Sequence, residues 1–125
     1  MEKELIAGAL ELIHSEFPYL LGVDDLADRL GVSKSHLIRE FHRAEGIPPG
    51  KYLELVRIEA AKRFLIQQDY PVSTVAGMVG YANGNYFCKV FRRVEGLSPG
   101  EYRRTFSELL SSDKGVEKAE KKLFL

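Results

Sequence analysis

The fold is decided by a stretch in the C-terminal half of the sequence, Gly80–Arg104, which reads GYANGNYFCKVFRRVEGLSPGEYRR. An earlier stretch, Gly31–Glu54, reads GVSKSHLIREFHRAEGIPPGKYLE and follows the same order of residue types. Both begin at a turn glycine, pass through a polar residue into a pattern of helical period, and reach a Glu-Gly pair before a proline. An internal repeat of this kind indicates that one local structure is built twice.

The two copies match position by position. Before the turn the spacing is 49 residues, with Ala27 opposite Ala76 and Gly31 opposite Gly80, and after the turn it is 50. The later pairs are Ser33 with Asn83, Leu37 with Phe87, Phe41 with Phe91, Arg43 with Arg93, Gly46 with Gly96, Pro49 with Pro99 and Tyr52 with Tyr102. A helix, a glycine-containing turn and a second helix with a polar N-cap form a helix-turn-helix unit. A solenoid array is the structural alternative, but only two copies are present and a dissimilar long helix separates them.

Periodicity predicts an all-α fold of about seven helices, since no stretch alternates with period two for long. We expect a first helix that ends before Pro18, a long fourth helix over about Gly50–Gln68 and a seventh over Tyr102–Leu110. The polar residues expected to cap helices are Asp24 or Asp25, Ser33, Ser73 and Asn83. The predicted divisions are a helix-turn-helix subdomain over 1–49, a linker helix over 50–69, a second subdomain over 70–106, and a charged tail over 107–125 that can add a helix.

Composition and spacing exclude several classes of protein. No run approaches the roughly 18 apolar residues of a membrane helix, and the N-terminal segment lacks the cleavage site of a signal peptide. No Ser/His/Asp set or carboxylate pair stands in a catalytic pattern, so neither an enzyme nor a cofactor is expected. His36 and His42 are six residues apart rather than four, so no metal site is expected. The single cysteine, Cys88, forms no internal disulfide.

Charge is unevenly distributed along a chain whose formal net charge is zero. Residues 1–30 carry two basic and seven acidic side chains, net −5, whereas residues 31–104 carry twelve basic and seven acidic ones, net +5. A neutral molecule with this layout can present a basic face to a polyanion. Chance clustering on an ordinary solvated surface is the alternative interpretation of the same numbers.

The second helix of each copy separates its residues into two stripes. The residues predicted to face inward are Leu37, Phe41 and Ala44 in the first copy, and Phe87, Val90, Phe91 and Val94 in the second. The outward stripes, at i, i+3, i+4 and i+7, are Ser35, Ile38, Arg39 and His42, and Asn85, Cys88, Lys89 and Arg92. These stripes suit base edges in DNA, because Arg and Lys donate to guanine, Asn pairs with adenine, and an apolar group contacts the thymine methyl.

Further basic and polar residues flank the stripes. Those predicted to contact phosphates are His36, Arg43, Arg93, Arg103 and Arg104, and the helix starts at Ser33 and Asn83 add backbone N–H groups for an anion. A linking helix of about 18 residues is about 27 Å long, which with packing on either side would hold the two reading helices about 34 Å apart, one turn of duplex. Since the stripes differ, the binding site should be asymmetric.

The segment VAGMVGYANGNYFCKVFRRVEGLSPGEYRR closely resembles the signature of the AraC/XylS family of bacterial transcription regulators. The matching elements are Gly80-Tyr81, Tyr86-Phe87, Phe91-Arg92-Arg93, Gly96, Ser98-Pro99 and Tyr102-Arg103, and with the first copy the resemblance covers about residues 5–106. It implies a seven-helix DNA-binding domain whose third and sixth helices enter adjacent major grooves. Carried over by position, the base-reading residues are Ser35, Ile38 and Arg39, then Asn85, Cys88 and Lys89. The last residues of the two stripes, His42 and Arg92, are predicted to contact phosphates. Gly84 departs from the pattern, since it lacks a side chain at the first turn of the sixth helix.

The predicted function is therefore a sequence-specific regulator of transcription that binds double-stranded DNA. Its expected partners are duplex DNA and RNA polymerase, and its expected location is the cytoplasm, at the nucleoid. We expect either a monomer or the DNA-binding part of a larger regulator that dimerises through another domain. The alternative is a helical protein-interaction module that docks on RNA polymerase or on a partner regulator without binding DNA.

Overall fold

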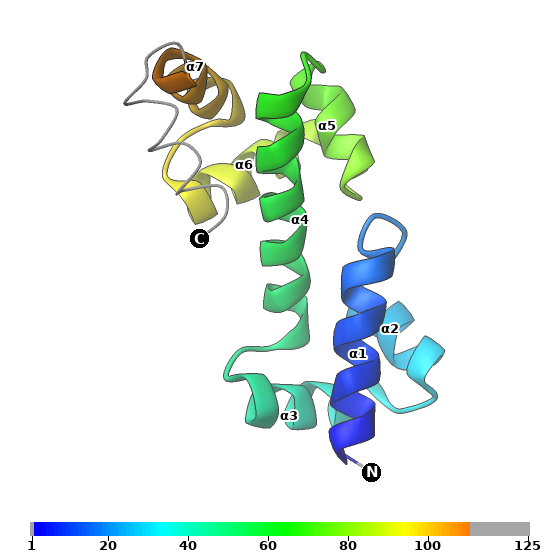
Figure 1. The fold of residues 1–125 in the computed structure, drawn as a ribbon. Helices are drawn as coiled ribbons and strands as arrows, with labels where there is room; N and C mark the ends of the chain where they lie inside the picture. The colour runs from blue at the N-terminus through cyan, green and yellow to red at the C-terminus, as the bar shows by residue number, and fades with distance from the viewer. Residues whose placement is uncertain (1, 111–125) are drawn as a thin grey trace. The chain divides into compact units, whose positions relative to one another are not determined.

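Glycine and proline divide the chain into seven helices, and the structure, a computed structural model, describes residues 2–110. The helices are α1 (Glu2–Glu16), α2 (Val23–Leu30), α3 (Lys34–Glu45), α4 (Pro49–Gln67), α5 (Val72–Met78), α6 (Gly84–Glu95) and α7 (Pro99–Leu110), as Figure 1 shows. No strand occurs within the described range, so the predicted all-α fold is confirmed. The seventh helix begins at Pro99, three residues earlier than predicted, because proline is well suited to the first turn of a helix. The extra helix considered for the tail beyond Leu110 lies outside the described residues.

The chain forms two compact units, unit 1 (Met1–Arg57) and unit 2 (Ile58–Leu125). The division falls inside α4, whereas the sequence suggested a separate linker over 50–69. The reason is that both parts of α4 carry core residues. Leu53 belongs to the core of unit 1, and the buried Ile58 and Leu65 fall in unit 2.

The core of unit 1 is made from one face of each of its helices. Its buried members are Ile6, Ala9 and Ile13 of α1, Leu26 and Ala27 of α2, Leu37 and Phe41 of α3, and Leu53 of α4, with Leu20 between α1 and α2. Spacings of three and four residues place such side chains on one side of a helix. Each fully buried Leu, Ile or Phe contributes about 1.5–3 kcal/mol.

Unit 2 repeats the packing of unit 1. The buried residues of its helices are Ile58, Ala60, Ala61 and Leu65 of α4, Val75 and Ala76 of α5, Phe87, Val90 and Phe91 of α6, and Tyr102 and Phe106 of α7. The Phe91 and Tyr102 rings lie 5.5 Å apart at 73°, and the corresponding Phe41 and Tyr52 rings in unit 1 lie 5.5 Å apart at 72°. The same edge-to-face pair thus recurs in each unit, 50 residues on.

A partly buried lysine joins α4 to the end of α6. Lys62 pairs with Glu95 of α6 at 3.1 Å and with Glu59 of its own helix at 3.0 Å. Burial opposes the charge of Lys62, but hydrogen bonds to Glu59 and Glu95 outweigh it and raise the pKa of the ammonium group. Its Nζ also lies 5.9 Å from the centre of the Tyr102 ring, and burial raises the pKa of that phenol. These contacts hold the C-terminal end of α6 against α4.

The turn inside each helix-turn-helix unit has the same hydrogen bonds in both copies. The N–H of Val32 donates to the carbonyl of Ala27 at 3.1 Å, and that of Tyr81 donates to Ala76 at 2.9 Å. Gly31 and Gly80 take positive φ values of 71° and 107°, a region that other residues rarely adopt. The residue inserted in the second copy falls between this turn and the cap of the next helix.

Two of the predicted N-caps are confirmed and two are wrong. The side chains of Ser33 and Asn83 accept from the third residue along their helices, His36 and Tyr86, each at 3.1 Å. The second helix starts after Gly22, so the aspartates predicted as its cap lie inside its first turn, where Asp25 accepts from the N–H of Leu21 at 2.9 Å. The fifth helix likewise starts after Pro71, which places Ser73 within it.

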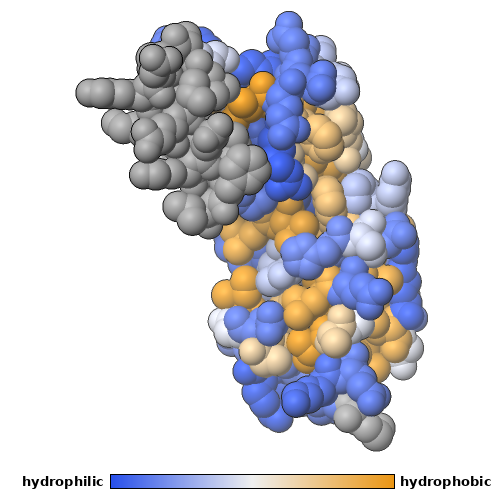
Figure 2. All heavy atoms as spheres, in the orientation of Figure 1, coloured by the Kyte–Doolittle hydropathy of each residue, from blue (hydrophilic) through white to orange (hydrophobic). Residues whose placement is uncertain are grey.

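The inward face of α3 differs from the predicted one at its C-terminal end. Ala44 is exposed, and Glu40 is buried instead. Ala44 borders a groove of about 510 Å³ that Ile6, Ala7 and Leu10 of α1 line from the other side. Figure 2 shows apolar side chains on this part of unit 1, bordered by hydrophilic ones. In α6, Val94 is half-buried, whereas the other three predicted inward residues are buried.

Candidate nucleic-acid interface

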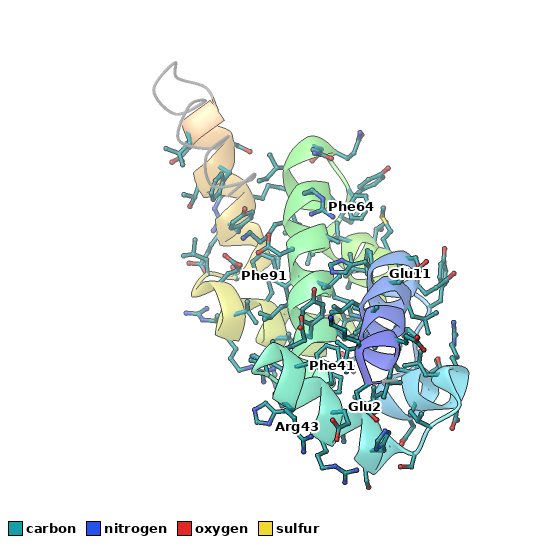
Figure 3. The ribbon with its side chains drawn as sticks, turned by 60° about the horizontal axis from the view of Figure 1, so that its bottom comes forward. Glu2, Glu11, Phe41, Arg43, Phe64 and Phe91 are labelled. Carbon is teal, nitrogen blue, oxygen red and sulfur yellow. The ribbon has the colours of Figure 1, made fainter. Side chains whose placement is uncertain are left out.

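The first candidate reading surface lies on α3. Leu37 and Phe41 are fully buried and fix the rotation of this helix about its axis. The residues of the predicted outward stripe, Ser35, Ile38, Arg39 and His42, are therefore all exposed. Figure 3 shows Phe41 turned into unit 1 and Arg43 projecting away from it. The stripe combines a hydroxyl, an aliphatic group and nitrogen donors within about two turns of helix.

The second candidate surface lies on α6 and is fixed in the same way. Phe87, Val90 and Phe91 are each fully buried. The predicted outward residues Asn85, Lys89 and Arg92 are exposed, and Cys88 is half-buried. In each unit the structure therefore brings the predicted residues together on the solvent side of one helix.

Arg39, the charged member of the three base-reading candidates on α3, is held by its neighbours on that helix. Its Nε lies 3.4 Å from Oε1 of Glu40, and its Nη2 lies 3.1 Å from Nδ1 of His36. Nε2 of His36 in turn lies 3.5 Å from a carboxylate oxygen of Glu2 in α1. Arg43 is also held, with Nη1 3.4 Å from Oε2 of Glu40. In α6 the residue that corresponds to Glu40 is Val90, which has no charge to offer a neighbouring arginine or lysine.

The predicted phosphate contacts have differing environments. His42, Arg92, Arg93 and Arg104 are exposed, His36 is half-buried, and the caps Ser33 and Asn83 are exposed at their helix starts. Arg92 lies 3.6 Å from a carboxylate oxygen of Glu101, an exposed pair that is readily exchanged for another partner. All of these side chains except His36 stand in solvent.

Arg103 has a structural contact that the sequence did not predict. It is half-buried, with Nε donating to the carbonyl of Leu65 at 2.9 Å and Nη2 donating to the carbonyl of Tyr70. Arg57 makes the same kind of contact in unit 1, with the carbonyls of Phe17 and Leu20. Each guanidinium satisfies two backbone acceptors where one helix ends before the next begins. We therefore assign Arg103 to the stability of unit 2 rather than to a phosphate.

Two residues near the surfaces were missed by sequence reasoning. Tyr86 was not among the predicted contacts, yet it is 54% exposed in the first turn of α6, with its ring 6.0 Å from that of Tyr81. It occupies the position of His36 in the first copy, and this alignment was the available signal. Glu40 aligns with Val90, so the repeat also indicated a buried position for it.

Other kinds of site find little support in the described part of the chain. No helix among residues 2–110 has both the length and the apolar character that crossing a bilayer requires. Within the same range, no three His, Cys, Asp or Glu side chains gather where a metal ion would be held.

Two helix-turn-helix units, each with a fixed second helix that exposes hydrogen-bond donors, define the class of double helix-turn-helix domains. A family profile described as "Helix-turn-helix domain" matches residues 26–105, which span both units. The chain belongs to the AraC-type family of helix-turn-helix transcription regulators. The resemblance inferred from the sequence is thereby confirmed.

Transcription regulators from bacteria are similar to this chain over most of its length. The bifunctional transcriptional activator/DNA repair enzyme AdaA of Bacillus subtilis is 35% identical over 103 residues, which are 82% of this chain and 49% of AdaA. A putative AraC-like transcription regulator of Streptomyces lividans is 36% identical over 80% of this chain and 33% of the relative. The chain thus spans half or less of the length of these two relatives.

Solved structures show the same fold. The C-terminal domain of AraT, a response regulator from Geobacillus stearothermophilus, has a TM-score of 0.78 at 31% identity and covers 81% of this chain and 84% of that domain. The DNA-binding domain of AdpA, a global transcriptional factor, was solved in complex with a target DNA. It has a TM-score of 0.78 at 29% identity and covers 82% of this chain and 93% of that one.

Proposed function

We propose that this chain binds double-stranded DNA sequence-specifically and is the DNA-binding part of a transcription regulator. The observation that carries the proposal is the repeated surface: α3 and α6 have equivalent buried anchors and equivalent exposed donors. The structural similarity to the AdpA domain, which was solved with its target DNA, supports it. The repair activity in the name of AdaA belongs to that relative, of which the chain covers half.

The proposed contacts follow the stripes. The base-reading residues are Ser35, Ile38 and Arg39 on α3, and Asn85, Cys88 and Lys89 on α6. The proposed phosphate-contacting residues are Ser33, His42, Arg43, Asn83, Arg92, Arg93 and Arg104. His36, predicted from the sequence as a further phosphate contact, instead holds Arg39 and faces Glu2. Arg and Lys at base edges supply specificity, whereas those at phosphates supply affinity that falls with salt.

We further propose that the two helices read adjacent major grooves. Helix α4, with 19 residues, belongs to both units and is about 28 Å long at about 1.5 Å per residue. Adjacent major grooves on one side of a duplex lie about 34 Å apart, and each unit would supply one reading helix for one groove. Because the stripes of α3 and α6 differ, the site should be asymmetric.

Partners beyond DNA are inferred from the family and from the chain's share of its relatives. RNA polymerase is a proposed partner, and dimerisation would come from another domain of a larger regulator. We place the protein in the cytoplasm, at the nucleoid. No observation on this chain favours the alternative of a docking module without DNA binding.

The test selects bound duplexes from a random pool and then measures affinity for the selected site against salt. Binding that neutralises Z phosphates should weaken with a log–log slope of about −0.9Z. Arg39→Ala and Lys89→Ala should each relax base preference at different positions, by about 1–3 kcal/mol. Arg63→Ala is the control, since Arg63 is an exposed arginine of α4 outside both stripes. A slope near zero would favour the docking module.

A further inference from the structure

Glu40 stands out as the buried charged residue of α3. It is 8% exposed, and among residues 2–110 it is the one charged residue that is buried. Its counterpart in the second copy, Val90, is fully buried. A valine therefore fits this position of the helix-turn-helix unit, and α3 carries a carboxylate there instead. Burying a carboxylate is costly unless its oxygens are paired, so its partners indicate its role.

Both partners of Glu40 are arginines on the candidate reading surface. Oε1 lies 3.4 Å from Nε of Arg39, and Oε2 lies 3.4 Å from Nη1 of Arg43. The arginine side chains are 59% and 71% exposed, against 10% for the glutamate side chain. The buried carboxylate thus contacts two solvent-exposed cations and holds one side of each guanidinium.

A histidine holds Arg39 from a second direction. Nη2 of Arg39 lies 3.1 Å from Nδ1 of His36. Because a guanidinium has no acceptor, Nδ1 must accept this hydrogen bond. The proton of the neutral imidazole then sits on Nε2, which faces a Glu2 oxygen at 3.5 Å. Glu2 and Glu40 therefore bracket the His36–Arg39 pair.

The donors that remain on Arg39 match a guanine. A guanidinium has five N–H groups. The contacts with Glu40 and His36 use the one on Nε and one on Nη2, which leaves both on Nη1 and the second on Nη2. The remaining groups include one on each terminal nitrogen, and two parallel donors of this kind can bond to O6 and N7 of guanine.

We propose that Glu40 is a positioning residue that presents Arg39 end-on to a guanine. The inference rests on the proposed function and assigns the base that the first unit reads. It also makes the two units differ in kind, because Val90 offers Lys89 no carboxylate. Unit 1 reads with a guanidinium that Glu40 holds, and unit 2 reads with a lysine at a position where no such carboxylate follows it.

The charge of Glu40 gives the proposal a distinctive signature. Without the carboxylate, Arg39 and Arg43 lose the negative charge that pairs with them, and both cations are available to any phosphate. Non-specific binding should therefore become tighter and more salt-dependent, while discrimination at one base pair falls. Loss of folding would weaken both kinds of binding, so the two effects are separable.

The experiment measures specific and non-specific duplex binding for Glu40→Val, which copies the residue of the second unit. Ordering a free arginine side chain costs a factor of about 10–30 in affinity. Because an exposed ion pair removes part of that cost, preference for guanine at the Arg39 position should fall about 3- to 10-fold. The non-specific salt slope should steepen by about 1. Glu45→Gln removes an exposed carboxylate from the same helix and should leave the guanine preference unchanged.

Glu40→Gln is the second variant, which keeps the shape of the side chain if the valine prevents folding, and thermal melting confirms that each variant is folded. A folded Glu40 variant with unaltered guanine preference overturns the inference and leaves the proposed function intact. The same holds if the selected site has no guanine at the position sensitive to Arg39→Ala. Failure of the wild-type chain to bind any duplex overturns the proposed function, and the inference with it.

Discussion

Replacing Arg103 with alanine should unfold unit 2 more easily without changing how the protein responds to salt on DNA. The guanidinium donates to the carbonyls of Leu65 and Tyr70 from a half-buried position. A hydrogen bond from a charged donor contributes about 1.5–3 kcal/mol. Both acceptors lie where α4 ends and water can partly replace the lost donor, so about 2–3 kcal/mol is expected for the pair. For a domain of this size, that corresponds to a fall in Tm of roughly 10 °C.

Urea denaturation followed by far-ultraviolet circular dichroism measures the loss, and a salt titration of duplex binding, done well below the Tm, measures the phosphate contacts. Arg104→Ala is the matched control, since Arg104 is the neighbouring, exposed arginine. It should change the unfolding free energy by less than about 0.5 kcal/mol and reduce the salt slope by about 0.9. Arg57→Ala should destabilise unit 1 as Arg103→Ala destabilises unit 2. If Arg103→Ala kept full stability and its salt slope fell by about 0.9, the value for one phosphate, Arg103 would be a DNA contact after all.

Three further predictions concern the ends of α6 and α7. Asn83→Ala should lower the unfolding free energy by about 1 kcal/mol in urea, and Asn83→Asp, which can still accept from Tyr86, should retain it. Gly84→Ala should raise the free energy of unfolding by up to about 1 kcal/mol, and with it the Tm, because a Cβ at this position meets no atom within 4 Å. Hydrogen bonds from Ser98, helped by nearby arginines, lower the pKa of Glu101. Its contribution to stability is therefore present above the pKa of the unfolded chain and disappears as the pH falls through the folded one, so Glu101→Gln should flatten the acid limb of a stability–pH profile.

The local features of the fold were predictable because they depend on neighbours in sequence. The caps at Ser33 and Asn83 bond three residues ahead, and the turn glycines need only their own backbone angles. The stripes on α3 and α6 were predictable for the same reason, since helical periodicity and a buried aromatic residue fix them.

The residues that were misassigned make contacts that the sequence does not contain. Arg57 and Arg103 donate to carbonyls between 33 and 40 residues away. The sequence alone does not distinguish an arginine that binds distant carbonyls from one that is exposed to solvent. Ala44 is small enough for either side of a helix, and only the groove beside α1 shows why it is exposed. Glu40 shows both effects. Its alignment with Val90 indicated a buried position, whereas its charge indicated an exposed one.

Cys88 gives the chain a built-in attachment point for spectroscopy. It is the only cysteine in the sequence, and it lies half-buried between the exposed Asn85 and Lys89 on the solvent side of α6. A maleimide fluorophore or a nitroxide label would react at this one place without prior mutagenesis. Quenching of the fluorophore or immobilisation of the nitroxide would then report, in real time, when another molecule binds to that side of the helix.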